Sequence, residues 1–248
     1  MKPLTTSLAV LALVVGAATA SAQTTYKLGL RGGFNRAITT LDAASTGTDA
    51  GFVNFSYSGD KSAIHAWQAG AVLEIDFGKF VLQPALLFSQ KGEQFNTVSS
   101  FSGVAGMSGT TTRSTNRYNW LELPVNAVYH VRDFQLFGGP YAALGVGGRR
   151  QGTTLNSSPF AKYAPQYFDE KIQYGPDTYN PRLDVGVNFG IGYRQGPMQV
   201  QLGYQMGLVR LHRSNAEGLI GELPYHDFNA DAAYNRVVQL TGTYFFEL

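Results

Sequence analysis

The residues FVLQPALLFSQKG, from Phe80 to Gly92, decide the fold of this chain. Their side chains alternate with a period of two, and successive residues of a β-strand point to opposite faces. The first face carries Phe80, Leu82, Pro84, Leu86 and Phe88, and the second carries Val81, Gln83, Ala85, Leu87 and Ser89. The first face is therefore wholly apolar, whereas Gln83 and Ser89 lie on the second.

Seven further segments alternate in the same way. Each is about as long as the roughly 9–11 residues that a tilted membrane strand requires, or somewhat longer. The predicted strands are 25–36, 64–77, 80–92, 117–131, 134–149, 182–195, 198–211 and 235–248. In the sixth strand, for example, Phe189 and Ile191 on one face oppose Asp184 and Asn188 on the other.

The connections between these strands distinguish a membrane barrel from a soluble one, which the alternation alone does not do. The three short connections are Gly78-Lys79, Arg132-Asp133 and Gly196-Pro197, and the four long ones are 37–63, 93–116, 150–181 and 212–234. Short turns that alternate with long external loops are typical of outer-membrane barrels. We therefore predict an all-β fold, an eight-stranded antiparallel up-and-down transmembrane β-barrel with both termini in the periplasm.

Aromatic residues support a membrane barrel, because many lie near the ends of the predicted strands, where such barrels carry aromatic girdles. These residues are Tyr26, Phe34, Trp67, Phe77, Phe80, Phe88, Tyr129, Phe134, Tyr193, Tyr204 and Tyr244. Aromatic residues make up 13% of the chain and charged residues only 15%, and the 29 glycines suit a fold with many turns. The final residues, Tyr244 to Leu248, resemble the terminal aromatic signal that the barrel-assembly machinery recognises.

The N-terminus has the layout of a secretory signal peptide. Lys2 precedes an apolar run from Leu8 to Ala18, and small residues lead up to Ala22. This run is shorter than the roughly 20 residues of a transmembrane helix. We predict a signal peptide over 1–22, cleaved after Ala22, and a barrel domain over 23–248 in the outer membrane of a Gram-negative cell.

Six segments resemble the PorT-like outer membrane proteins, whose domain is an eight-stranded barrel. They read YKLGLRGGFN (26–35), LQPALLFSQKG (82–92), NWLELPVNAVYHV (119–131), LFGGPYAALG (136–145), VGVNFGIGYR (185–194) and VVQLTGTYFF (237–246). The resemblance implies the fold and the outer-membrane location. It implies no catalytic residue, because the family shares no catalytic motif, although one namesake serves protein secretion.

If the apolar face meets lipid, the charged and titratable residues of the other face lie inside the barrel. These residues are Lys27, Arg31, Glu74, Asp76, Lys91, Glu122, His130, Asp184, Arg194 and Glu247. An eight-stranded barrel is just wide enough to be filled by side chains, and buried charge is tolerated when it is paired and hydrogen-bonded. We therefore predict a polar network that fills the lumen, with a narrow path for water or ions as the alternative.

Catalysis and metal binding find little support in the sequence. His65, His212 and His226 lie at external strand ends or in loops, where the barrel proteases and acyltransferases of this membrane have their active sites, and Asp227 follows His226. Their spacing fixes no catalytic triad, which is recognised by geometry. The chain has no cysteine and no Cys/His metal pattern. We expect no enzymatic activity, no cofactor and no metal.

The long connections carry the functional hypotheses. Connection 93–116 is rich in Ser, Thr and Gly and is expected to be flexible. Connection 150–181 has six aromatic residues and four prolines, so we expect it to fold over the barrel mouth or to present a contact surface. The partners that we expect are outer-membrane lipids, the assembly machinery and an envelope protein or surface ligand, and not nucleic acid. A channel or transporter for small solutes or lipids is the alternative, followed by a hydrolase or acyltransferase sited in the loops.

Overall fold

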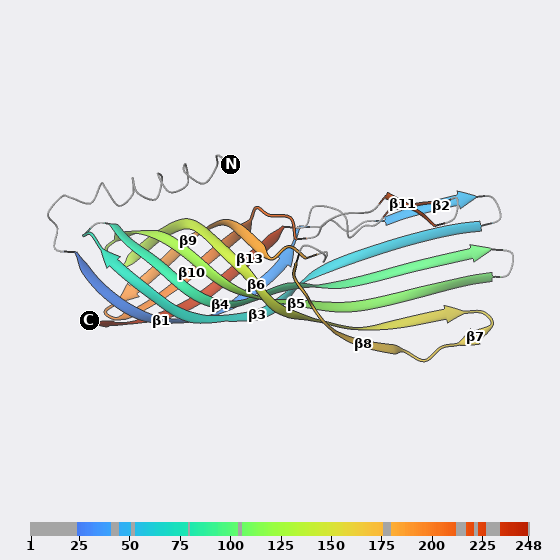
Figure 1. Cartoon of the computed structure of the whole chain (residues 1–248), viewed down its shortest axis with the longest axis horizontal. Helices are drawn as coiled ribbons and strands as arrows, with labels where there is room; N and C mark the ends of the chain where they lie inside the picture. The colour runs from blue at the N-terminus through green and yellow to red at the C-terminus, as the bar shows by residue number, and fades with distance from the viewer. Residues whose placement is uncertain are drawn as a thin grey trace.

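The structure, a computed structural model, describes residues 24–40, 45–50, 53–78, 80–103, 106–175, 180–211, 217–220, 223–226 and 234–247. Eight long strands form a closed antiparallel ring (Figure 1). They are β1 (Thr25–Thr39), β3 (Val53–Asp76), β4 (Phe80–Gly103), β5 (Gly106–Val131), β6 (Phe134–Ser158), β9 (Leu183–Gln195), β10 (Met198–Gly207) and β13 (Asn235–Glu247). Each strand pairs with the next one along the chain, and β1 pairs with both β3 and β13, which closes the barrel. The predicted fold is confirmed.

Five short strands lie beyond the ring. They are β2 (Ser45–Ala50), β7 (Ala161–Lys162), β8 (Gln166–Lys171), β11 (Glu217–Ile220) and β12 (Leu223–His226). Strand β2 pairs with β3, both β7 and β8 pair with β6, and β11 pairs with β12. Within the described residues, no helix is long and apolar enough to cross a membrane.

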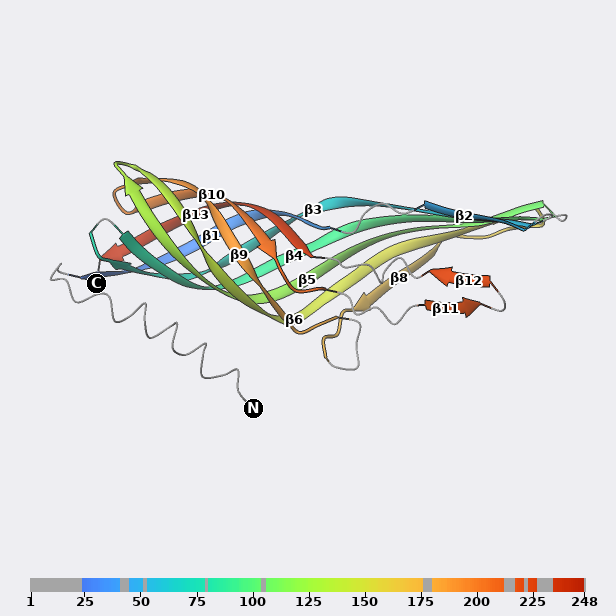
Figure 2. The same cartoon turned by 90° about the horizontal axis from the view of Figure 1, so that it is seen from above.

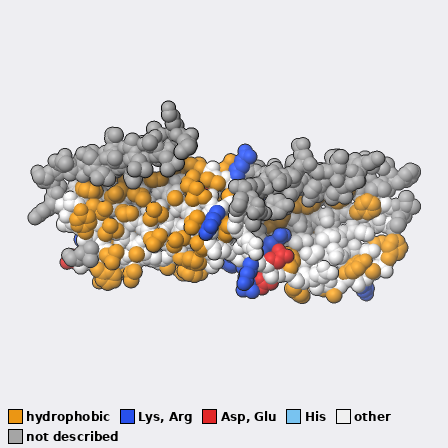
Figure 3. All heavy atoms as spheres, viewed as in Figure 1, with side chains coloured by type: hydrophobic (Ala, Val, Ile, Leu, Met, Phe, Trp, Pro, Cys, Tyr) orange, Lys and Arg blue, Asp and Glu red, His pale blue; other side chains and the backbone are white. Residues whose placement is uncertain are grey.

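The two faces of the strands are placed as predicted. Leu86 is 53% exposed on the outside of β4, whereas its neighbour Gln83 is completely buried in the lumen. Large apolar side chains cover the outside of the ring as a belt (Figure 3). The aromatic girdles are also present near both ends of the belt, since Phe34 pairs in register with Trp67 at one end and Phe80 packs on Tyr129 at the other. A soluble barrel would carry its apolar side chains inside, so this arrangement suits a lipid environment.

The short connections are tight turns. They lie at the same end of the barrel as the start of β1 and the end of β13, and we call this the turn end (Figure 1). Arg132 and Gly196 have φ angles of 59° and 58°, in the left-handed region that such turns use. In the turn between β3 and β4, the Asp76 carboxylate accepts a hydrogen bond of 2.7 Å from the Gly78 backbone N–H. The opposite end is the loop end.

At the loop end, four strands continue far beyond the ring. Strands β3, β4, β5 and β6 have 24 to 26 residues, against 10 to 15 for the other strands of the ring. Their outer halves form a single layer that we call the projecting sheet (Figures 1 and 2). Beyond the pair Glu93 and Asn116, the β4–β5 hairpin continues for ten more residues per strand, to the pair Gly103 and Gly106. At about 3.4 Å per residue, the sheet extends about 34 Å past the mouth.

The prediction of a flexible loop over 93–116 is therefore wrong, as are the predicted loop boundaries at 37–63 and 150–181. The prediction relied on the Ser- and Thr-rich composition of residues 93–116, but threonine is β-branched and suits strands as well as loops. Here the hydroxyls pair across strands. Thr112 Oγ1 lies 3.2 Å from Thr154 Oγ1, and the Thr110 hydroxyl donates a hydrogen bond of 2.9 Å to the side-chain Oδ1 of Asn156. Strand β10, in contrast, is shorter than predicted: it ends at Gly207 and not at residue 211.

Candidate functional site

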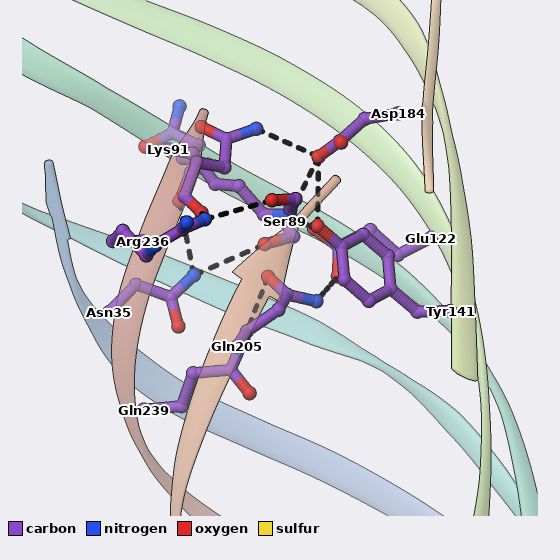
Figure 4. A network of polar contacts seen from close by, with 12 residues as sticks. Asn35, Ser89, Lys91, Glu122, Tyr141, Asp184, Gln205, Arg236 and Gln239 are labelled. Atoms are coloured by element: carbon purple, nitrogen blue, oxygen red, sulfur yellow. Dashed lines mark hydrogen bonds and ion pairs between the residues drawn. The ribbon is translucent and has the colours of Figure 1, made fainter. Parts of the chain in front are cut away.

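The lumen holds, toward its loop end, an ion-pair cluster built from three strands (Figure 4). Lys91 Nζ of β4 lies 2.6 Å from Glu122 Oε1 of β5 and 3.8 Å from Asp184 Oδ2 of β9. The same Asp184 oxygen accepts hydrogen bonds from the Tyr141 hydroxyl at 3.0 Å and from the Asn235 amide at 2.8 Å. Lys91, Glu122 and Asp184 are at most 1% exposed. The cluster thus joins one cation to two carboxylates in a site closed to solvent.

A second ion pair lies nearer the turn end. Arg194 Nη1 lies 2.5 Å from Glu74 Oε2, which also accepts a hydrogen bond of 3.0 Å from the Gln83 amide. The Arg194 guanidinium stacks on the Phe245 ring at 4.7 Å. Phe245 fills the lumen here because the facing residue is Gly29, where a Cβ atom would approach the ring to 2.8 Å. Arg194 and Phe245 thus fill the lumen at this level, beyond which it opens toward the turn end.

Amides fill the space between the two ion pairs. Gln199 donates to Gln135 at 2.8 Å, and Gln83 donates to Gln199 at 3.2 Å, so the three side chains bridge β4, β6 and β10 across the lumen. Above them, Gln205 donates to the Glu122 carboxylate at 3.1 Å. A cavity of about 10 Å³, room for about one water molecule, lies between Arg31, Glu122 and Gln205. Side chains therefore occupy the lumen between the two ion pairs.

The ten residues predicted to face the lumen divide into two groups. The structure places six of them in the interior: Arg31, Glu74, Lys91, Glu122, Asp184 and Arg194. The other four lie at the turn end, where the lumen opens: Lys27, Asp76, His130 and Glu247. Glu247 is exposed, and Asp76 holds the turn at Gly78. For the six interior residues the sequence pattern predicted the lumen face, but it did not show how deep in the barrel each one lies.

A third polar cluster, at the mouth, was not anticipated. Lys61 Nζ lies 3.0 Å from Glu93 Oε2 and 2.7 Å from Thr39 Oγ1, and the Thr39 hydroxyl also donates to Glu93. Desolvation by burial lowers the pKa of Lys61, although Glu93 opposes this shift. Sequence reasoning missed the cluster because both Lys61 and Glu93 were assigned to loops. Because the alternation of apolar and polar residues fades in these segments, the sequence offers no clear signal for the cluster.

Aromatic residues close the mouth above the Lys91 cluster. Trp120 and Tyr118 of β5 pack with Tyr141, and Tyr174 from the segment after β8 lies edge-on to Trp120 at 5.3 Å. Burial raises the pKa of the Tyr174 hydroxyl. Connection 150–181 thus folds over the mouth at Tyr174, as one form of the prediction expects, and Tyr167, at 82% exposed, faces solvent on β8. Tyr179 lies outside the described residues.

The projecting sheet carries a groove near its outer end, with a volume of about 370 Å³. Phe55, Phe101 and Tyr163 line it, all substantially exposed. The other lining residues are Ser99, Ser100, Ser108, Gly109, Thr110, Asn156, Ser157 and Ser158. Hydroxyl groups and aromatic rings therefore dominate the groove, and none of the residues that line it is charged.

The candidate catalytic histidines do not come together in the described part of the chain. His65 is exposed on the outside of β3, and its backbone carbonyl accepts a hydrogen bond of 2.9 Å from Arg117. His212 and Asp227 lie outside the described residues, as does the side chain of His226. Within the described residues, no group of three or more His, Cys, Asp or Glu side chains could hold a metal ion.

Comparison with known proteins adds a family to this geometry. Residues 21–213 match the profile of the family described as "Outer membrane protein beta-barrel domain". Among solved structures, the chain is similar to Neisserial surface protein A, with 8% identity and a TM-score of 0.35 over 91% of this chain and 100% of that one. It is also similar to the outer membrane protease OmpT from Escherichia coli, with 12% identity and a TM-score of 0.35 over 90% and 96% of the two chains. These TM-scores are too low to support an argument about function. No curated protein matches the sequence significantly.

Proposed function

Because this chain belongs to the outer membrane protein beta-barrel domain family, we propose that it is a non-conducting, non-enzymatic barrel that displays a binding platform outside the cell. Outer-membrane barrels place their short turns in the periplasm and their long connections outside. The projecting sheet then stands on the external side. The observation that carries the proposal is the continuation of four ring strands as a paired sheet about 34 Å beyond the mouth.

The lumen supports an anchoring role over a conducting one. The Lys91 cluster, the glutamine bridge and Phe245 occupy successive levels of the barrel, and the cavity between Arg31, Glu122 and Gln205 holds about one water molecule. An open pore requires a wider barrel, such as the 16-stranded porins have. Cross-lumen hydrogen bonds would also have to break for a solute to pass. The barrel therefore serves as a rigid base for the sheet.

The groove on the projecting sheet favours an uncharged ligand rich in hydroxyl groups, such as a surface saccharide. Serine, threonine and asparagine side chains supply donors and acceptors for such a ligand. Phe55, Phe101 and Tyr163 offer exposed ring faces for the apolar faces of sugar rings. A strongly acidic or basic ligand would find no opposite charge among the lining residues. The same surface would suit an envelope protein less well, because it is open and polar.

An array of neutral and acidic oligosaccharides, probed with the detergent-solubilised protein, tests the binding role. We expect neutral oligosaccharides to bind and the double variant Phe55→Ala/Phe101→Ala to lose that binding. Leu86→Ala, on the lipid-facing side of the same barrel, is the matched control. A photo-reactive residue at position 101 provides the second arm in native envelopes. If it captures a protein while the array stays negative, the proposed saccharide ligand is wrong. If it captures nothing and the array stays negative, the proposed binding role of the projecting sheet is wrong.

Two finer assignments belong with this proposal. We propose that the chain is a PorT-like member of the family, because the six segments quoted above lie on β1, β4, β5, β6, β9 and β13. We also propose that residues 1–22 are a signal peptide, cleaved after Ala22. They lie outside the described residues, so the mass of the protein purified from outer membranes is the test. A mature chain that begins elsewhere than Gln23 would contradict this cleavage site.

A further inference from the structure

Cations gather on the outside of the barrel where the apolar belt ends at the loop end (Figure 3). On β1, Arg36 follows Phe34, which is 74% exposed, by two residues on the same face. Arg182 directly precedes the exposed Leu183 of β9, and Arg210 follows the exposed Leu208 by two residues. Strands β5, β6 and β8 contribute Arg117, Arg149 and Lys171. The belt thus has a basic edge on this side.

Three of these cations stand side by side on adjacent strands. Arg117 pairs in register with Arg149, and Arg149 pairs with Lys171. Like charges at directly opposed positions of a sheet repel each other and destabilise it. One carboxylate offsets part of the charge, because Asp169 accepts hydrogen bonds of 2.6 and 2.7 Å from Arg149. The row therefore keeps an excess of positive charge that an external anion would neutralise.

The Arg117 side chain is already held in place along this row. It crosses β4 and donates a hydrogen bond of 2.9 Å to the His65 backbone carbonyl on β3. The residue of β4 that pairs with Arg117 is Gly92, which has no side chain to obstruct the crossing. A guanidinium that is held in advance loses less conformational freedom when it binds a planar anionic group. Its remaining N–H groups are available to an anion in the plane of the membrane surface.

The turn end shows that this basic edge is not a general property of the belt. There, the described charged residues have both signs, with Lys27 and Arg132 near Asp76, Asp133 and Glu247. Among the described residues, positive charge is in excess at the loop end and not at the turn end. Cations placed at the level of lipid headgroups attract anionic headgroups, and arginine binds phosphate with paired hydrogen bonds.

We propose that the row of Arg117, Arg149 and Lys171 binds a phosphate group of a phosphorylated glycolipid in the outer leaflet. Arg36, Arg182 and Arg210 extend the same attraction around the edge of the barrel and fix its depth in the membrane. This site lies outside the barrel and does not depend on the groove of the projecting sheet. The binding role of that sheet and the lipid site therefore succeed or fail separately.

Native mass spectrometry of the detergent-solubilised protein with added lipid A tests the site. Wild-type protein should bind lipid A, and Arg117→Gln should bind about tenfold more weakly, the value of one charged hydrogen bond. The triple variant Arg117→Gln/Arg149→Gln/Lys171→Gln should lose stoichiometric binding. Arg132→Gln, a cation at the turn end, is the control and should bind as wild type. The shift in gel mobility between unheated and heated samples shows that each variant is folded.

Dephosphorylated lipid A and inorganic phosphate provide the other arms. We expect the dephosphorylated lipid to bind no better to the wild type than to the triple variant, and inorganic phosphate to stay unbound in the same spectra. Equal binding of both lipids to the wild type would overturn the proposal. A triple variant that binds lipid A like the wild type would also overturn it. Stoichiometric binding of inorganic phosphate alone would replace the lipid by a soluble anion.

Discussion

Removing the cation of the lumen cluster should cost more stability than removing its nearer carboxylate. Lys91 lies 2.6 Å from Glu122 and 3.8 Å from Asp184, so one cation neutralises two carboxylates. Lys91→Met leaves both carboxylates buried without an opposite charge. Breaking a buried pair in this way destabilises a protein by about 3–5 kcal/mol. We expect Lys91→Met to lower the free energy of unfolding by that amount.

Glu122→Gln should be milder for a reason that only the structure provides. Loss of Glu122 would cost about 3–5 kcal/mol if it left Lys91 buried and unpaired. Asp184 remains beside Lys91, however, and a glutamine oxygen can still accept the hydrogen bond from Gln205. The loss reduces to one hydrogen bond to a charged group, about 1.5–3 kcal/mol.

Equilibrium unfolding in urea, with the protein in lipid vesicles and circular dichroism as the readout, measures both variants. Lys162→Met, at an exposed position of β7, is the control and should stay within about 0.5 kcal/mol of wild type. If Lys91→Met loses less stability than Glu122→Gln, at least one of the carboxylates is neutral in the folded barrel. The charge assignment of the cluster would then be wrong.

Three further outcomes are expected. Leu86→Arg places a cation on the lipid face at a cost of about 2–4 kcal/mol, so less protein should reach the folded, heat-modifiable form; wild-type yield would mean that the faces are inverted. In planar bilayers the wild type should show no stable conductance, and uniform steps of porin size would refute the filled lumen. Hydrogen bonds from Arg149 and Gln151 lower the pKa of Asp169. The stabilisation of β8 on β6 is thus present above the ordinary carboxylate pKa of about 3.9 and is lost as pH falls through the lower folded value. Protease sensitivity of β8 should rise there in wild type and be constant in Asp169→Asn; equal profiles would remove the role of this pair.

The ring was predictable because a membrane strand is constrained on both of its faces. Lipid requires an unbroken apolar row, such as Phe80 to Phe88, and a filled lumen requires a second row of different chemistry. Both rows can be recognised in the local sequence, because each recurs at every second residue. Short turns with Gly196 or Gly78 then fix which strands are neighbours. Few alternatives survive these constraints.

The projecting sheet was not predictable by the same reasoning, because neither of its faces meets lipid. Residues 97–112 carry small polar side chains on both faces, so the alternation of apolar and polar residues fades where the membrane ends. What keeps these residues in strands is the sheet itself, since β3 to β6 leave the ring already in register. A strand that starts from a formed pair avoids the cost of closing a new loop.

The candidate sites were only partly predictable for a related reason. Alternation assigns Lys91 and Glu122 to the lumen, but it does not show that Asp184, 62 residues further along the chain, lies at the same level. That level depends on the register of β4, β5 and β9, which bulges such as the one between Asn119 and Trp120 shift. Lys61 and Glu93 were missed because they lie past the expected strand ends.

The external cations follow from the same boundary between lipid and water that ends the apolar pattern. Arg36, Arg117 and Arg149 all occur where the continuous apolar belt ends on the outward face, yet their strands continue beyond it with only scattered apolar residues such as Met107 and Leu155. The end of the apolar row therefore marks the membrane surface and not the end of the strand. Once the two are separated, the basic residues at that point belong to the headgroup layer, and the hydroxyl-rich residues beyond it belong to a surface in water. This single distinction is the reason why we propose a lipid ligand for the first and a soluble ligand for the second.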